Sequence, residues 1–349
     1  MDFEISPIDF RKATNEEWKM YHDYRRKYLA EESPGDPILD DEKEEVWMND
    51  VYEENEVFSY YVTKRDTPSE MIAFLRARYV SEGTPSYPGN EHIMRTLLYV
   101  LRDYRRQGIG RKLLELVTQL AQEHGKSLIS AGTSQDDGRE ALKKLGAKEA
   151  LTMRDNRTNM DYIDWEMVKS WNEEGPRRSP DSRLEFFTEI PDEILEDYCK
   201  VYTEVLNQAP YDELERGDSV FTPELWRKRE QMTKETGITW ITAMIREKDG
   251  AISGMTDVFY EPAHIHMLYQ ALTGVQDKYR GSGKGKWLKA AMLLKIREEY
   301  PGVKTITTGN ATSNEPMLAI NERLGFKLYK EQYSYQIETE KVAEYLKKK

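Results

Sequence analysis

The stretch that decides the fold is residues 270–285, QALTGVQDKYRGSGKG. Its apolar, β-branched beginning predicts a strand that ends near Val275, and a glycine-rich loop then opens a helix that starts WLKAAMLL. The first turn of a helix leaves backbone N–H groups unpaired, and glycines let an anion approach them closely. The loop therefore predicts a phosphate-binding site. The basic residues around it are Lys278, Arg280, Lys284 and Lys286.

The glycine spacing narrows the kind of phosphate loop. A Walker loop needs Ser or Thr after Gly-Lys, whereas Lys284 is followed by Gly285. The dinucleotide fingerprint G-x-G-x-x-G is not met either, because the glycines run G-x-G-x-G. What remains is Arg280-x-x-Gly283-x-Gly285 between a strand and a helix. This pattern resembles the pyrophosphate loop of the GNAT family of acetyl-CoA-dependent N-acetyltransferases.

The same pattern occurs a second time, in Val100–Gly110, VLRDYRRQGIG. Its key positions precede those of the later loop by a constant number of residues, as in 280 − 105 = 175, which is half of the 349-residue chain. A repeat of this length indicates two copies of a domain. The resemblance implies a layered α+β (α/β/α) class with two tandem GNAT folds. Each would have a mixed, mostly antiparallel sheet, a splayed central strand and flanking helices, an architecture similar to mycothiol synthase.

A linker is predicted near the middle of the chain. Trp171–Asp181, WNEEGPRRSPD, is polar and contains two prolines and a glycine, which favours a boundary between domains. We therefore expect an N-terminal domain over residues 1–172, a linker over residues 173–182, and a C-terminal domain over residues 183–349.

The two copies differ in the helix that follows the loop. The earlier helix, GREALKKLG, has no asparagine, whereas the block 310–326, NATSNEPMLAINERLGF, has several on one side of a predicted helix. The resemblance implies that such asparagines line the pantetheine arm, so we expect the chemistry in the second copy, with the first degenerate. The expected cofactor-binding residues are Val275, Arg280, Gly281, Ser282, Gly283, Lys284, Gly285, Asn310, Asn314 and Asn321, with Arg105, Gly108 and Gly110 in the first copy.

The family resemblance also implies the chemistry. An amine would attack the acetyl thioester directly in a ternary complex, and the backbone N–H of Val275 would stabilise the oxyanion. Asn321 stands where the family often has a tyrosine acid, and it can donate only an amide hydrogen bond to sulfur. Glu261 and Asp257, at the end of the preceding strand, are candidates for the general base, with the nearby histidines as alternatives. The competing hypothesis is a non-catalytic CoA-binding or scaffold protein.

Composition limits the partners and the compartment. Lys and Arg number 51 against 63 Asp and Glu, so the net charge is −12, which disfavours nucleic acid and anionic membranes. The acidic segments 39–56 and 211–218 suggest a small cationic amine as acceptor. Cys199 is the one cysteine, and the scattered histidines predict no metal site. We expect a cytoplasmic monomer or homodimer, because the sequence shows neither a signal peptide nor an apolar run of ~20 residues.

Overall fold

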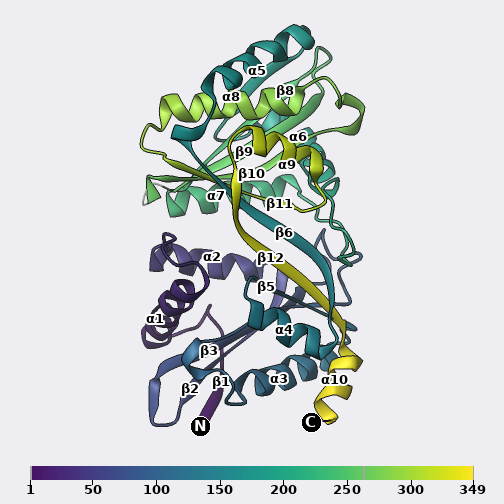
Figure 1. Ribbon diagram of the computed structural model, residues 1–349. Coiled ribbons are helices and arrows are strands. Elements are labelled where there is room, and N and C mark those ends of the chain that lie inside the picture. Colours follow the sequence, from purple (N-terminus) through teal and green to yellow (C-terminus); the bar gives the residue numbers. More distant parts are fainter. Residues whose placement is uncertain (1, 262–263, 349) are drawn as a thin grey trace. The chain divides into compact units, whose positions relative to one another are not determined.

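The computed structural model describes residues 2–261 and 264–348, and the chain divides into two compact units (Figure 1). Unit 1 comprises residues 1–151, 213–218 and 332–349, and unit 2 comprises residues 152–212 and 219–331. Each unit contains a mixed, mostly antiparallel sheet with helices on both faces. The predicted α+β class is therefore confirmed.

In unit 1 the strands are ordered β1-β2-β3-β4-β5-β12. The elements are β1 (Phe3–Ile8), α1 (Asn15–Glu32), α2 (Asp41–Glu54), β2 (Asn55–Lys64), β3 (Thr67–Val80), β4 (Ile93–Val100), α3 (Ile109–Glu123), β5 (Leu128–Thr133), α4 (Asp136–Leu145), the last part of β12 (Lys327–Glu338) and α10 (Thr339–Lys347). Only β4 and β5 are paired in parallel among the strand pairs of this unit that the structure describes.

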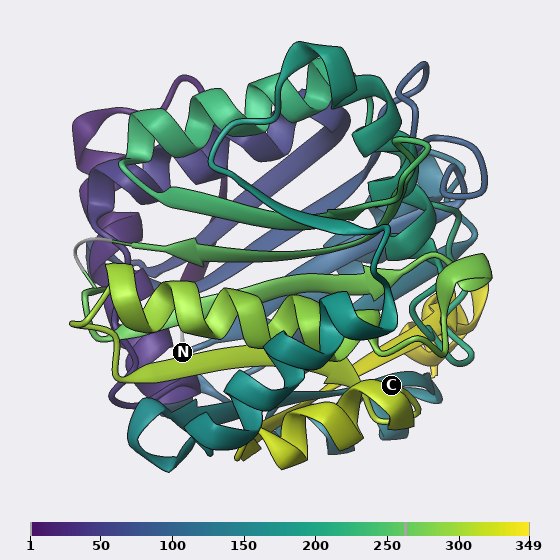
Figure 2. The ribbon, with the colours of Figure 1, turned by 90° about the horizontal axis from the view of Figure 1, so that it is seen from above.

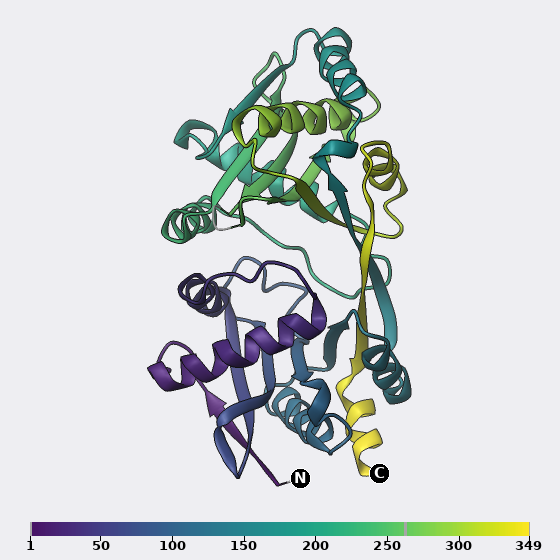
Figure 3. The ribbon, with the colours of Figure 1, turned by 60° about the vertical axis from the view of Figure 1, so that its left-hand side comes forward.

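The sheet of unit 1 is apolar on both faces because alternate residues of its strands point to opposite sides. Leu75 and Met94 pack with Leu113 of α3 on one face. Phe74 packs with Tyr24 of α1 on the other, and Figure 3 shows α1 crossing the strands there. Helix α1 begins after Thr14 because a capping box joins Thr14 and Glu17.

In unit 2 the strands are ordered β6-β11-β10-β9-β8-β7. The elements are β6 (Lys148–Asn159), α5 (Trp165–Arg178), β7 (Arg183–Phe187), α6 (Asp192–Asn207), α7 (Pro223–Thr236), β8 (Thr239–Arg246), β9 (Ile252–Tyr260), β10 (Met267–Val275), α8 (Lys284–Glu299), β11 (Thr305–Ala311), α9 (Glu315–Arg323) and the first part of β12. Helix α8 covers one face of the sheet, and α6 and α7 cover the other.

The two units do not coincide with the two halves of the sequence. Residues 153–159 of β6 pair with β11 in unit 2, although they follow the first copy along the chain. Residues 333–338 of β12 pair with β5 in unit 1, although they end the second copy. Most of the stretch 173–182 lies in helix α5, so the polar segment taken for a linker is helical up to Arg178. Its charged residues form ion pairs along that helix.

A search of the described part of the chain for long, apolar helices finds none that could cross a membrane.

Candidate functional site

The first glycine loop, Arg105–Gly110, joins β4 to α3 in unit 1. Gly108 is the N-cap of α3 with a φ of 87°, a left-handed conformation that favours glycine. A Cβ on Gly108 or Gly110 would meet no atom within 4 Å, so the backbone there faces open space. The first N–H groups of α3 have no acceptor within the helix. The loop therefore presents donors at the positive end of the helix dipole, which suits a phosphate.

Strands β4 and β5 splay apart next to this loop. Their parallel pairing ends at Thr96, and the rest of β4 has no partner on that side among the described strands. The N–H of Leu101 bonds to β3, and successive residues of a strand point in alternate directions. The N–H groups of Leu98 and Val100 are therefore directed into the gap between β4 and β5. They are unused donors beside the loop.

A cavity of about 640 Å³ fills this gap in unit 1. Its walls come from β4, the glycine loop, α3, α4 and β5, and it includes Arg105, Gly108 and Gly110. The end of the chain completes it with Tyr345 and Leu346 of α10. A volume of several hundred Å³ is typical of small-molecule and cofactor sites. The residues predicted to bind the cofactor in the first copy thus line a cavity.

Arg105 organises one end of the cavity. Its Nε donates to the carbonyl of Val100 at 2.9 Å, and its guanidinium pairs with Asp137 in the first turn of α4. The guanidinium also lies 5.0 Å from the ring centre of Tyr99. The arginine thus ties the end of β4 to the start of α4 and leaves the loop amides uncovered.

Side chains that can exchange protons lie close together where the C-terminal end of α1 meets the cavity. The hydroxyl of Tyr99 donates to Glu31 at 3.0 Å and accepts from Gln135 Nε2 at 3.0 Å. Gln135 Nε2 also donates to Glu32 Oε2 at 2.8 Å. Tyr99, Gln135 and Glu32 all line the cavity. Burial raises the pKa of Tyr99 to about 12, so this phenol stays protonated at neutral pH.

The second glycine loop, Arg280–Gly285, has nearly the same backbone in unit 2. Gly283 is the N-cap of α8 with a φ of 84°, and Arg280 Nε donates to the carbonyl of Val275 at 3.2 Å. The surroundings differ, however. Lys284, expected to contact phosphate, is buried, and its Nζ donates to Ser179 Oγ at 2.8 Å and pairs with Glu247 at 3.4 Å.

Helix α5 covers the groove that would correspond to the cavity of unit 1. It lies beside α8 (Figure 2), and its Trp171 is buried in the same cluster as Trp287 of α8 and Leu324. A Cβ on Gly175 of α5 would lie 2.2 Å from the ring of Trp287, so the two helices are in close contact. The guanidinium of Arg323 on α9 lies over Trp171 at 4.6 Å. Side chains of α5 therefore fill the space between α8 and α9.

Comparisons with known proteins show which family part of the chain matches and which solved structures share its fold. Residues 17–146 match the model of the acetyltransferase (GNAT) family. A tandem GNAT protein from the clavulanic acid biosynthesis pathway, solved without acetyl-CoA, aligns at 21% identity with a TM-score of 0.75, covering 97% of this chain and 99% of that one. Residues 17–146 thus match the GNAT family, and the chain as a whole shares the fold of a tandem GNAT protein.

Other solved structures share the fold of this chain. A GCN5-related N-acetyltransferase from Sphaerobacter thermophilus aligns at 13% identity with a TM-score of 0.60, over 97% of this chain and 96% of that one. The N-myristoyltransferase of Saccharomyces cerevisiae with bound myristoyl-CoA aligns at 11% identity with a TM-score of 0.54, over 96% and 78%. A search of the curated proteins finds no match.

The asparagines expected along the pantetheine arm have partners inside unit 2. Asn321 is 1% exposed, and its amide accepts from Lys289 Nζ at 2.8 Å and donates to Asn310 Oδ1 at 2.7 Å. Asn314 caps α9 by accepting from the N–H of Met317. Asn321 and Asn310 thus join α8, α9 and β11, whereas Asn314 serves the start of its own helix. The sequence signal for this was α8 itself, which has no single apolar stripe and buries even Lys284 and Lys289.

The candidate bases of the second copy are buried. Asp257 is fully buried and accepts from Thr242 Oγ1 at 2.7 Å, and Glu261 is 2% exposed. The structure places Asp257 on β9, where α6 and α7 cover the sheet, and burial raises its pKa from 3.8 to about 7. Asp257 lies beside the central strand β10, because its backbone carbonyl accepts a hydrogen bond from Gln270 Nε2 at 2.7 Å.

Asp257→Asn is expected to stabilise the protein only at high pH. Because the folded pKa is raised, the folded state binds more protons between about pH 4 and 7, and stability falls as the pH rises through that window. An asparagine carries no charge, so we expect it to raise the free energy of unfolding by ~2 kcal/mol at pH 8 and by nearly nothing at pH 4. Denaturant unfolding at both pH values measures this, with the exposed Asp181→Asn as control. An equal effect at both pH values would contradict it.

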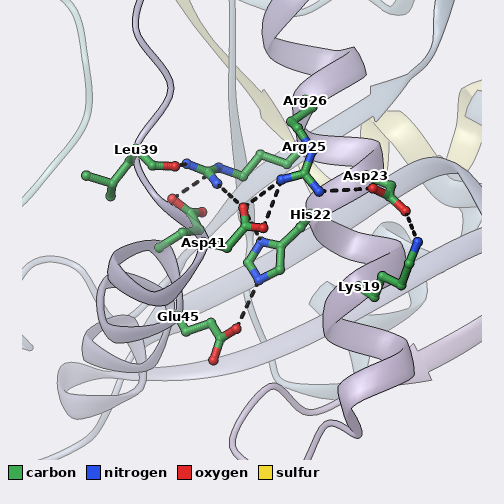
Figure 4. Close-up of polar contacts among 9 residues, drawn as sticks. Lys19, His22, Asp23, Arg25, Arg26, Leu39, Asp41 and Glu45 are labelled. Carbon is green, nitrogen blue, oxygen red and sulfur yellow. Dashed lines mark hydrogen bonds and ion pairs between the residues drawn. The ribbon is translucent and has the colours of Figure 1, made fainter. Parts of the chain in front are cut away.

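The acidic segment 39–56 is held against α1 and does not form a free rim for a cation. His22 Nε2 lies 3.0 Å from Glu45 Oε1, and Arg26 pairs with Asp41 at 2.8 Å (Figure 4). The buried His22 and Arg25 make these contacts part of the packing between α1 and α2.

The acidic loop 211–218 also differs from expectation. Most of it, residues 213–218, belongs to unit 1, whereas the sequence placed it at an acceptor site of the second copy. Glu215 pairs with His92 at 2.6 Å, and its backbone exchanges two hydrogen bonds with Gln336. Glu213 pairs with Lys148 at 2.6 Å. Two of the carboxylates that suggested a cationic acceptor, Glu213 and Glu215, thus have a partner within the chain.

Proposed function

We propose that the protein is an acetyl-CoA-dependent N-acetyltransferase and that it binds acetyl-CoA in the cavity of unit 1. The single observation that carries this is the 640 Å³ cavity between the splayed β4 and β5, which ends at the first glycine loop. The family match over residues 17–146 includes this loop and supports the choice. The corresponding groove of unit 2 is filled by α5, which argues against the second copy as the main site.

The residues of unit 1 fit the cosubstrate. The amides of Gly108–Gly110 would hold the diphosphate, and Arg105 would keep the loop in shape. The N–H groups of Leu98 and Val100 would bind the pantetheine arm and the thioester oxygen, at which negative charge develops. The apolar walls from α3, α4 and α10 would cover the rest.

The reaction we propose is direct transfer in a ternary complex. The acceptor nitrogen forms a bond to the acetyl carbon, the carbon–sulfur bond breaks, and one proton leaves the nitrogen. Glu32 would take that proton, directly or through a water molecule. Tyr99, which stays protonated, would donate a hydrogen bond or proton to the departing sulfur. A thiol with a free pKa of about 8.5 is a good leaving group, so strong acid catalysis is not required.

Two measurements on the full chain test this proposal. Calorimetry should show saturable binding of acetyl-CoA with one site per chain, and a thiol-release assay with a panel of primary amines should show turnover. Absence of acetyl-CoA binding would overturn the proposal. Binding without turnover for any amine would instead favour the non-catalytic CoA-binding protein. Binding at two equivalent sites would show that α5 leaves the second loop accessible.

A further inference from the structure

Two arginines face each other across the sheet of unit 1. Arg78 of β3 and Arg95 of β4 are direct partners in the antiparallel register. Side chains at such positions start about 5 Å apart, and like charges there are destabilising. Arg76 lies two residues before Arg78 and therefore on the same face. Three cations are thus concentrated on one small part of the sheet.

None of the three arginines forms an ion pair with a carboxylate within the described residues, 2–261 and 264–348. Arg78 makes no hydrogen bond or ion pair there, Arg95 donates to the amide oxygen of Asn90 at 2.5 Å, and Arg76 lies 2.8 Å from the sulfur of Met48. Burial and the neighbouring Arg76 and Arg95 lower the pKa of Arg78 to about 10. In a chain with twelve more acidic than basic residues, an uncompensated arginine cluster is unexpected on composition alone.

The cluster lies beside the cavity. Leu97 and Tyr99 follow Arg95 on the same face of β4, because they are two and four residues further along, and both line the cavity. Arg76 is the cross-strand partner of Leu97. Two residues along a strand correspond to about 7 Å, which an arginine side chain can span. This is the face that α1 crosses, opposite to α3.

We propose that Arg78 and Arg95 bind an anionic group, a carboxylate or a phosphate, of the acceptor substrate. This rests on the proposed function, and it defines the acceptor as an amine that also carries an anion. Guanidinium groups form paired, charge-assisted hydrogen bonds with either anion, and such a ligand would relieve the repulsion between the two arginines. Several carboxylates of the acidic segments that suggested a cationic acceptor, among them Asp41, Glu45 and Glu213, have basic partners within the chain.

Matched pairs of amines test the acceptor class. Lysine against cadaverine and ornithine against putrescine vary only the carboxylate, and glucosamine 6-phosphate against glucosamine varies only the phosphate. We expect the anionic member of one pair to have a kcat/KM at least about tenfold higher, a difference of ~1.4 kcal/mol. The doubly substituted Arg78→Met, Arg95→Met chain should lose this preference through KM, with kcat unchanged. Equal kcat/KM within every pair would overturn the inference and leave the proposed transferase intact.

A second experiment does not depend on enzymatic activity. Inorganic phosphate should raise the melting temperature of the native chain more than that of the Arg78→Met, Arg95→Met variant, because the glycine loops are the same in both. Without phosphate, Arg78→Met should be at least as stable as the native chain, since it removes a like-charge contact. The exposed Arg65→Met, which loses only a surface ion pair with Asp2, is the control. A variant that is less stable and equally responsive to phosphate would show a structural role for these arginines and refute anion binding.

Discussion

Gly110→Asp should weaken acetyl-CoA binding at least about a hundredfold, a loss of ~2.7 kcal/mol. The new carboxylate would lie in the first turn of α3, repel the diphosphate, and occupy the backbone N–H groups that would otherwise bind it. The fold should be unaffected, because a Cβ at Gly110 meets no atom within 4 Å and its φ is not positive. Calorimetric titration with acetyl-CoA, alongside a melting curve, measures both effects.

The second copy provides the matched control for this substitution. Gly285 occupies the same place in the second loop, also without a neighbour within 4 Å of its Cβ. We expect Gly285→Asp to leave the affinity for acetyl-CoA within about a factor of two, a few tenths of a kcal/mol. The opposite pattern, loss of binding in Gly285→Asp alone, would move the cosubstrate to the second loop, as the sequence suggests.

Lys289→Met should stabilise unit 2 at neutral pH. Lys289 is 2% exposed, and within the described chain its Nζ has the side chain of Asn321 as its one hydrogen-bond acceptor. Burial lowers its pKa from 10.5 to about 7. Below about pH 7 the buried amine must carry a charge, and methionine has a similar shape without that cost. We expect a gain of ~2 kcal/mol at pH 7 after the lost hydrogen bond is counted.

The pH dependence distinguishes this cause from better packing. Between about pH 7 and 10.5 the unfolded chain binds a proton at Lys289 that the folded chain releases, so the native protein becomes more stable as the pH rises. The advantage of Lys289→Met should therefore shrink toward pH 10. Denaturant unfolding at pH 7 and pH 10, with the exposed Lys248→Met as control, measures it. A constant gain, or a loss at pH 7, would refute a desolvated lysine.

The repeat and the fold could be predicted from the sequence because they depend on local patterns. The spacing of Arg105, Gly108 and Gly110 specifies a strand, a tight loop and a helix, and the structure has all three. The constant separation of 175 residues then implies a second copy with the same backbone. These features can be predicted without knowing which segments pack against them.

The sequence could not predict which copy has an open cavity, because that depends on contacts between distant segments. The asparagines of 310–321 look suited to a ligand, and only the packing shows that Lys289 and α9 already use them. The proline and charges of residues 173–182 favour a linker, whereas the structure continues α5 to Arg178 and Gly175 lets that helix approach Trp287. Likewise, Arg78 and Arg95 are 17 residues apart in sequence, and only the strand register places them opposite each other.

The exchanged strands have a consequence for synthesis in the cell. Residues 1–151 form most of unit 1, yet its sheet lacks β12 until residues 333–338 have been made. Strand β5 therefore waits unpaired on that side while the chain between residues 133 and 333 is translated, a period in which unpaired strands are prone to aggregate. A polypeptide that stopped before residue 333 would form unit 1 without this part of β12 and without α10, the helix that completes its cavity.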